Sequence, residues 1–88
     1  MHTHRMERLI YQRWGRRIRD ARTGMYSQGQ LARIVGVSKG TMSKYESGVL
    51  HVPDGTKWRI AGALHRSLDE LFAWPIDVPP YPAERVAA

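Results

Sequence analysis

The chain has 88 residues, of which 42% are apolar and 25% charged, a composition typical of one small globular domain with a modest core. It contains no Cys, which excludes disulfide frameworks, zinc–thiolate sites, iron–sulfur clusters and thiol nucleophiles. The formal net charge of +6 favours a polyanion as the partner, although an Arg-rich solvated surface is the alternative explanation.

Apolar residues spaced three and four apart predict an amphipathic first helix. Thr3 is a candidate cap at its beginning, and Thr23 and Gly24 are typical of its end. We treat residues 1–13 as a basic N-terminal extension, which either continues the helix or forms a loose arm. The apolar stripe consists of Met6, Ile10, Trp14, Ile18, Ala21 and Met25. The other faces carry Arg5, Arg8, Arg13, Arg16, Arg17 and Arg19.

Two short helices separated by a glycine turn are predicted next. Ser27 and Gln30 have the spacing of a capping box, which indicates a helix that begins there and ends at Gly36. Ser38 is the next cap and predicts a helix over Lys39–Ser47. On a helical wheel one face of this second short helix is polar and consists of Lys39, Gly40, Ser43 and Lys44.

The rest of the chain predicts two more helices and a proline-rich tail. Ser67 and Glu70 form a second capping box, which opens a short fifth helix ending near Ala73. Four prolines within residues 75–82 are incompatible with a further helix. No segment alternates with a period of two, so we predict an all-α fold of five helices, with residues 14–73 as the domain and residues 74–88 as the tail. The fourth helix follows a loop at residues 52–55 and is marked by Trp58, Ile60, Ala61 and Leu64.

The spacing of residues across the two short helices carries a more specific signal. It reads Ser27-Gln28-x-x-Leu31-Ala32-x-x-Val35-Gly36-Val37-Ser38-x-x-Thr41-Met42-Ser43-x-x-Glu46-x-Gly48, and it continues through Pro53, Ile60-Ala61-x-Ala63-Leu64 and Leu68-Asp69-Glu70-Leu71-Phe72. Over residues 14–73 this pattern resembles the lambda-repressor-like, Cro/XRE-type helix-turn-helix DNA-binding domains. The resemblance implies that the helix at 39–47 reads base pairs in the major groove.

The resemblance also implies roles for individual residues. An Arg of the first helix pairs in this family with a Glu late in the reading helix, and these positions match Arg22 and Glu46. The alternative is two exposed charges, and the turn after Arg22 is one residue shorter than the common pattern. Gln28 is expected to touch a phosphate and to brace the first residue of the reading helix.

The expected DNA contacts fall into two groups. Lys39 and Lys44 carry donors that suit guanine O6 and N7, so we expect G·C pairs in each half-site. A solvated surface is the alternative for each single position. The resemblance implies that the base-reading set is Lys39, Gly40, Thr41, Ser43 and Lys44, and that the phosphate set is Ser27, Gln28, Ser47 and Lys57.

These features predict a sequence-specific regulator of transcription, with double-stranded DNA as the partner and a repressor of the phage repressor or Cro kind as the first hypothesis. An antitoxin with autoregulatory DNA binding is the alternative, its toxin bound by the C-terminal segment. A protein adaptor that uses the fold without DNA is the third hypothesis. No nucleophile–base–acid set is visible and His2 and His4 lack a third ligand, so we expect no catalysis, metal or cofactor.

Assembly and location complete the expectations. Residues 1–66 contain 13 basic and 4 acidic residues (+9), whereas residues 67–88 contain 1 and 4 (−3), so the C-terminal region suits the seam of a homodimer on a palindromic operator. The apolar residues beyond the last predicted helix either fold back over their own core or pack across this seam, in a homodimer held partly by residues 68–82; they are Trp74, Ile76, Val78 and Tyr81. The chain lacks an apolar run of membrane-spanning length and its first residues lack a secretory signal, so we expect a cytoplasmic, nucleoid-associated protein.

Overall fold

The computed structural model describes the backbone of residues 2–75 and the side chains of residues 7–75. Residues 2–75 form five helices and no strand, which confirms the predicted all-α class. Most of the predicted proline-rich tail, residues 76–88, lies outside the described residues. The helices are α1 (His2–Arg22), α2 (Gln28–Val35), α3 (Lys39–Ser47), α4 (Asp54–Leu64) and α5 (Leu68–Phe72).

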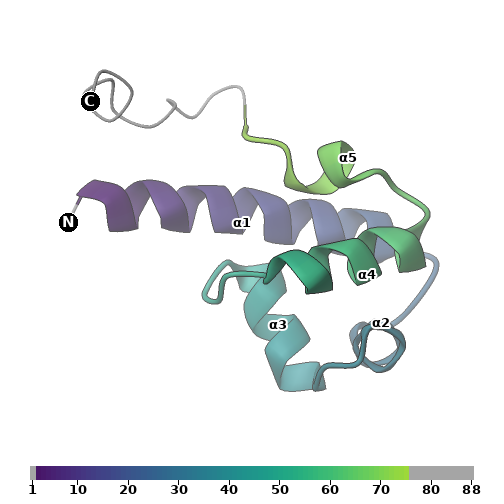
Figure 1. Ribbon diagram of the computed structural model, residues 1–88. Helices are drawn as coiled ribbons and strands as arrows, with labels where there is room; N and C mark the ends of the chain where they lie inside the picture. The colour runs from purple at the N-terminus through teal and green to yellow at the C-terminus, as the bar shows by residue number, and fades with distance from the viewer. Residues whose placement is uncertain (1, 76–88) are drawn as a thin grey trace.

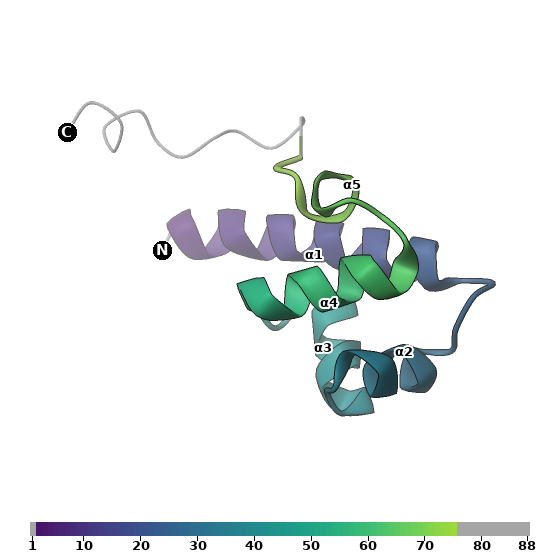
Figure 2. The same cartoon turned by 45° about the vertical axis from the view of Figure 1, so that its right-hand side comes forward.

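The long helix α1 organises the arrangement of the other four (Figure 1). The C-terminal end of α3 meets α1 near its middle, and α2 lies beside α3. Helices α4 and α5 contact α1 and each other, and α4 also contacts α2. Both views show that the N-terminal half of α1 extends past α3 on the side away from α2 (Figures 1 and 2).

The ends of α1 differ in part from the sequence expectation. The helix already includes Thr3, so the prediction that Thr3 caps it is wrong. The residues around Thr3 include no Gly or Pro, so the helix can extend past it to begin at His2. The predicted end is confirmed, since α1 stops at Arg22. Met25, placed in the apolar stripe, therefore lies beyond the helix and is 44% exposed.

One core is shared by all five helices. Trp14 connects α1 with α5, because its indole N–H donates to the carbonyl of Ala73 (3.0 Å) and its ring meets Phe72 edge to face. Arg17 donates to the same carbonyl (2.9 Å) and so helps to close the C-terminal end of α5. The buried apolar residues are Ile10, Trp14, Ile18, Leu31, Ala32, Val35, Met42, Tyr45, Val52, Ile60, Ala61, Leu64, Leu71 and Phe72.

The caps read from the sequence set most helix boundaries. Both capping boxes are present, with the backbone N–H of Ser27 donating to Gln30 (2.8 Å) and that of Ser67 donating to Glu70 (2.9 Å). The second bond lowers the pKa of the Glu70 carboxyl, and Arg66 acts in the same direction. The expected loop at residues 52–55 is too long, because α4 begins at Asp54.

Candidate nucleic-acid interface

A tight turn sets the angle between α2 and α3. Gly36 adopts a left-handed conformation (φ 90°), which a residue with a side chain rarely adopts. Its N–H and that of Val37 both donate to the carbonyl of Ala32 (2.8 and 3.0 Å), which closes α2. Ala32 is 1% exposed, so its small side chain lies inside the core close to this turn. The geometry is that of a helix-turn-helix.

Helix α3 presents a polar face to solvent. Its apolar residues Met42 and Tyr45 are buried, whereas the predicted base-reading residues Lys39, Gly40, Ser43 and Lys44 are exposed. Among residues 7–75, neither the Lys39 nor the Lys44 ammonium group lies within 4 Å of a carboxylate. The structure therefore brings these four residues together on one accessible, positively charged surface.

Thr41 lies at the margin of this surface. It is half-buried, its backbone N–H donates to the Ser38 side chain (3.0 Å), and the two hydroxyl groups are 2.9 Å apart. Its side chain therefore forms part of the cap of α3, which limits its freedom to reach a base edge.

The opposite end of α3 is held by a buried carboxylate. The Glu46 side chain is fully buried and accepts two hydrogen bonds from Arg22, from Nε (2.8 Å) and Nη2 (2.9 Å). This pairing raises the pKa of the Arg22 guanidinium above its ordinary value, against the opposing effect of burial. Arg19 lies 3.6 Å from the same carboxylate. The structure thus brings Arg22 and Glu46 together, and burial of Glu46 excludes the alternative of two exposed charges.

Gln28 also contacts this carboxylate. Its side-chain amide donates to Glu46 Oε1 (3.1 Å), so Gln28 braces the last turn of α3 rather than the first. The expectation that Gln28 braces Lys39 is therefore wrong, because the buried acceptor lies at the other end of the helix. Among residues 7–75, every buried side-chain nitrogen and oxygen atom has a hydrogen-bond partner.

Two glycines allow α1 and α3 to approach each other closely. A Cβ atom added at Gly15 would overlap the carbonyl oxygen of Glu46 and lie 2.5 Å from that of Tyr45. A Cβ atom added at Gly48 would lie 2.5 Å from the backbone nitrogen of Gln12. The sequence analysis missed Gly15. The available signal was a single glycine in the middle of a strongly helical pattern, which typically marks close packing.

The remaining predicted phosphate contacts are placed differently from one another. Ser27 is exposed at the beginning of α2, and Ser47 is exposed at the end of α3. Lys57 is not with them, because its ammonium group lies 4.5 Å from the centre of the Trp14 ring and 3.7 Å from Asp54. Its side chain is only 17% exposed, so we do not retain Lys57 among the proposed DNA contacts.

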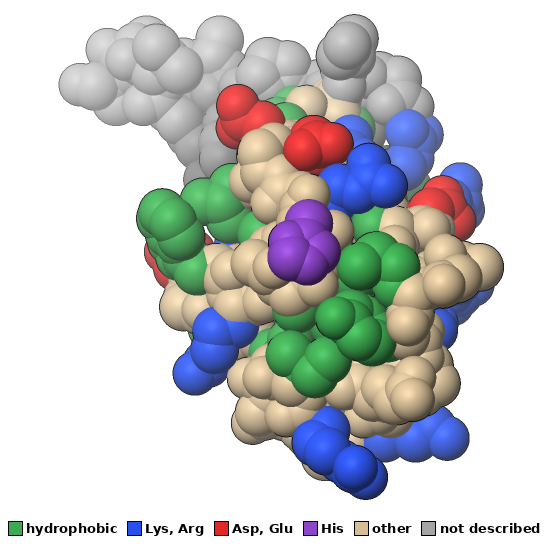
Figure 3. All heavy atoms as spheres, turned by 90° about the vertical axis from the view of Figure 1, so that its right-hand side faces the viewer, with side chains coloured by type: hydrophobic (Ala, Val, Ile, Leu, Met, Phe, Trp, Pro, Cys, Tyr) green, Lys and Arg blue, Asp and Glu red, His purple; other side chains and the backbone are tan. Residues whose placement is uncertain are grey.

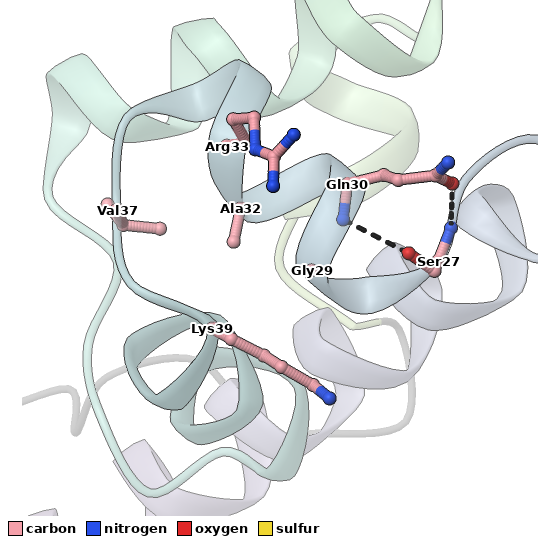
Figure 4. A pocket seen from close by; sticks show the side chains of 7 residues that line it. All are labelled: Ser27, Gly29, Gln30, Ala32, Arg33, Val37 and Lys39. Carbon is pink, nitrogen blue, oxygen red and sulfur yellow. Dashed lines mark hydrogen bonds between the residues drawn. The ribbon is translucent and has the colours of Figure 1, made fainter.

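A groove of about 520 Å³ separates α2 from the beginning of α3 (Figure 4). Gly29 and the capping box of Ser27 and Gln30 lie along one wall. Lys39 and Arg33 lie at two edges of the groove. The aliphatic part of Lys39 passes close to Gly29, which supports the side chain while its ammonium group points outward.

The face that Figure 3 shows combines apolar and basic character. Hydrophobic side chains gather at its centre, and Lys and Arg side chains lie along its lower edge. The exposed apolar residues of the described chain include Met25 before α2 and Ile34 on α2.

Within residues 2–75, no helix has the length and apolarity needed to cross a lipid bilayer.

A family model described as Helix-turn-helix matches residues 17–71, from the second half of α1 to α5. No curated protein and no solved structure matches the chain.

Proposed function

The chain belongs to the Cro/XRE-type helix-turn-helix family of DNA-binding transcriptional regulators, and we propose that this protein is a repressor that acts by occupying its operator. The observation that supports sequence-specific binding is the exposed face of α3. Lys39 and Lys44 are both exposed, and within residues 7–75 neither lies within 4 Å of a carboxylate; the last turn of their helix is fixed by Glu46. A rigid helix with donors on its outer face suits the major groove.

The spacing of the two lysines suggests what they read. Lys39 and Lys44 are five residues apart, about 7.5 Å along the axis of α3. This length corresponds to about two base-pair steps at 3.4 Å each. We infer that each lysine donates to a different guanine, with Ser43 between them and Gly40 allowing close approach of the backbone. Ser27, Gln28 and Ser47 contact phosphates on either side.

Repression by occupancy requires only that the bound protein block a promoter. All five described helices belong to, or pack against, the unit that the family model matches, and this unit contains the reading helix. Binding to DNA on the nucleoid is the mechanism that we propose for this unit, with protein concentration or a partner protein as its control.

A homodimer on a palindromic operator is part of the proposal, because one reading helix covers only a few base pairs. The side formed by α4 and α5 supports self-association. Trp58 is 68% exposed there and lines two adjoining hollows together with Leu68. Residues 54–75 contain three basic and three acidic residues, so two such surfaces meet without net repulsion. Of the predicted seam at 68–82, residues 76–82 lie outside the described part of the chain.

Selection of bound sequences from a random DNA pool tests the proposal. We expect a palindromic consensus with G·C pairs in each half-site, and sedimentation of the complex should show two protomers per operator. A pool without enrichment would contradict sequence-specific binding. Enrichment of a single half-site with one protomer would contradict the dimer.

The antitoxin hypothesis makes a different prediction. An antitoxin should purify from its native host with a stoichiometric protein partner that is lost when residues 74–88 are removed. The repressor that we propose should purify without such a partner. An adaptor should bring a partner but enrich no DNA sequence, and the charged face of α3 argues against it.

A further inference from the structure

One edge of α1 carries exposed cations that the helix-turn-helix unit does not explain. Arg8, Arg16 and Arg19 are exposed, and we call these three residues the α1 arginine edge. At 100° per residue they fall within about 80° of one another, on the side of α1 that also carries Gly15. Since Gly15 contacts the C-terminal end of α3, the arginine edge runs along the junction of α1 with the reading helix.

The charges of this edge are not neutralised by neighbouring acids. Among residues 7–75, neither Arg8 nor Arg16 lies within 4 Å of a carboxylate. Arg19 lies 3.6 Å from Glu46, but that carboxylate already accepts bonds from Arg22 and Gln28, and the Arg19 side chain remains 57% exposed. The edge is therefore a surplus of positive charge beside α3.

The N-terminal part of the edge lies on the side of α3 away from α2. Helix α2 packs against α3 on one side, and the N-terminal half of α1 extends past α3 on the other (Figures 1 and 2). Arg8 lies in this extension, which the family model does not cover. From Arg8 to Arg19 the edge measures about 16 Å along the helix axis. Such a length spans several phosphates of one DNA strand.

We propose that the α1 arginine edge binds the DNA backbone, on the groove wall opposite the one that the N-terminal end of α2 contacts. This inference rests on the proposed function, because it needs α3 in the major groove. The continuous helix of α1 holds the edge at a fixed distance from α3, so the contact adds affinity without reading bases. The protein then contacts the phosphate backbone on both sides of the major groove that α3 reads.

Salt dependence tests the proposal on the full chain. The slope of log affinity against log salt is negative. Arg8→Gln/Arg16→Gln should reduce its magnitude by about 1.8, since each phosphate contact contributes about 0.9. The matched control is Arg8→Lys/Arg16→Lys, which changes the same two side chains but keeps both positive charges. The control should leave the slope nearly unchanged, and thermal melting should show that both variants fold.

A second readout separates phosphate contact from a general effect of charge. The wild-type protein should bind an operator extended by about five base pairs on each side more tightly than one that ends at the half-site. Arg8→Gln/Arg16→Gln should bind both probes equally. If the variant and its control gave equal slopes while the wild-type protein still bound its operator, the proposed role of the arginine edge would be wrong and the proposed function would stand. Absence of wild-type binding to any selected sequence would instead overturn the proposed function.

Discussion

The two ends of α3 differ in almost every physical respect. At its C-terminal end Glu46 is buried and bonded to α1 and α2, and Gly15 brings the α1 backbone into direct contact. At its N-terminal end Lys39 and Gly40 are exposed, and the Ser38 side chain caps the helix by accepting from the backbone N–H of Thr41. The comparison shows how a small domain offers a helix to a partner. One end is fixed firmly so that the other can be left free.

The fixed end uses polar as well as apolar contacts. A buried carboxylate is costly unless its hydrogen bonds are satisfied, and here Arg22 satisfies both oxygens. Such an interaction has a defined geometry, whereas apolar packing tolerates small shifts. We infer that the Arg22–Glu46 pair sets the orientation of α3 relative to α1.

The largest effect should come from filling the contact at Gly15. Gly15→Val places its side chain against the carbonyl groups of Tyr45 and Glu46, which are backbone atoms that cannot rotate away. We expect a loss of about 3 kcal/mol or more in the free energy of unfolding, measured by urea denaturation. Gly62→Ala is the control, because nothing lies within 4 Å of its added Cβ, and it should stabilise α4 by roughly 0.5–1 kcal/mol. Equal stability of the two variants would contradict the close approach.

Glu46→Gln should have the next largest effect. It keeps the shape of the side chain but leaves the Arg22 guanidinium without its counter-charge, so we expect a loss of about 2–3 kcal/mol in unfolding free energy. Affinity for the operator should also fall, because the orientation of α3 is less well held. Glu70→Gln is the matched control at an exposed ion pair, and it should cost far less. A change at Glu46 as small as the control would show that apolar packing alone positions α3.

On the exposed face of α3, substitution should alter sequence preference rather than stability. Lys44→Ala should cost about 1–3 kcal/mol of discrimination at particular base pairs while leaving the unfolding free energy nearly unchanged. Gln28→Ala should instead weaken binding to all sequences by a similar factor. Lys57→Ala is the control lysine, because it contacts Trp14 and should leave base preference as it is. Binding to a panel of operator variants measures all three, and identical profiles for Lys44→Ala and Gln28→Ala would contradict the proposed reading face.

The smallest effect concerns pH and the cap of α5. The pKa of Glu70 is lowered on folding, so its contribution to stability is present above its ordinary pKa and is lost as the pH falls through the lowered value. We expect the melting temperature to fall below about pH 4.3, and to fall less steeply in Glu70→Gln. The raised pKa of Arg22 adds no dependence between about pH 5 and 9, because that contribution is lost only as the pH rises through the raised value. Coincident pH profiles for wild type and variant would contradict the role of the Glu70 carboxylate.

Local features of the sequence determined where most helices begin and end. A cap needs only a Ser or Thr and a neighbour three residues away, so Ser27, Ser38 and Ser67 were recognised without knowledge of the fold. The polar face of α3 was also predictable, because the position of a side chain around a helix follows from its number in the chain. These properties depend on interactions within one or two turns.

Tertiary structure alone decided which of the remaining residues have structural roles. Gly15 and Glu46 are far apart in sequence, and their contact exists only once α1 crosses α3. The same holds for Gln28, whose amide turns to Glu46 because that buried carboxylate lies within reach, and for Lys57, whose ammonium group lies over the Trp14 ring. Trp58 has a large apolar side chain of the kind usually found in a core, but it lies on the outer side of α4. Burial and electrostatic pairing depend on what the rest of the chain places nearby, and no local pattern encodes that environment.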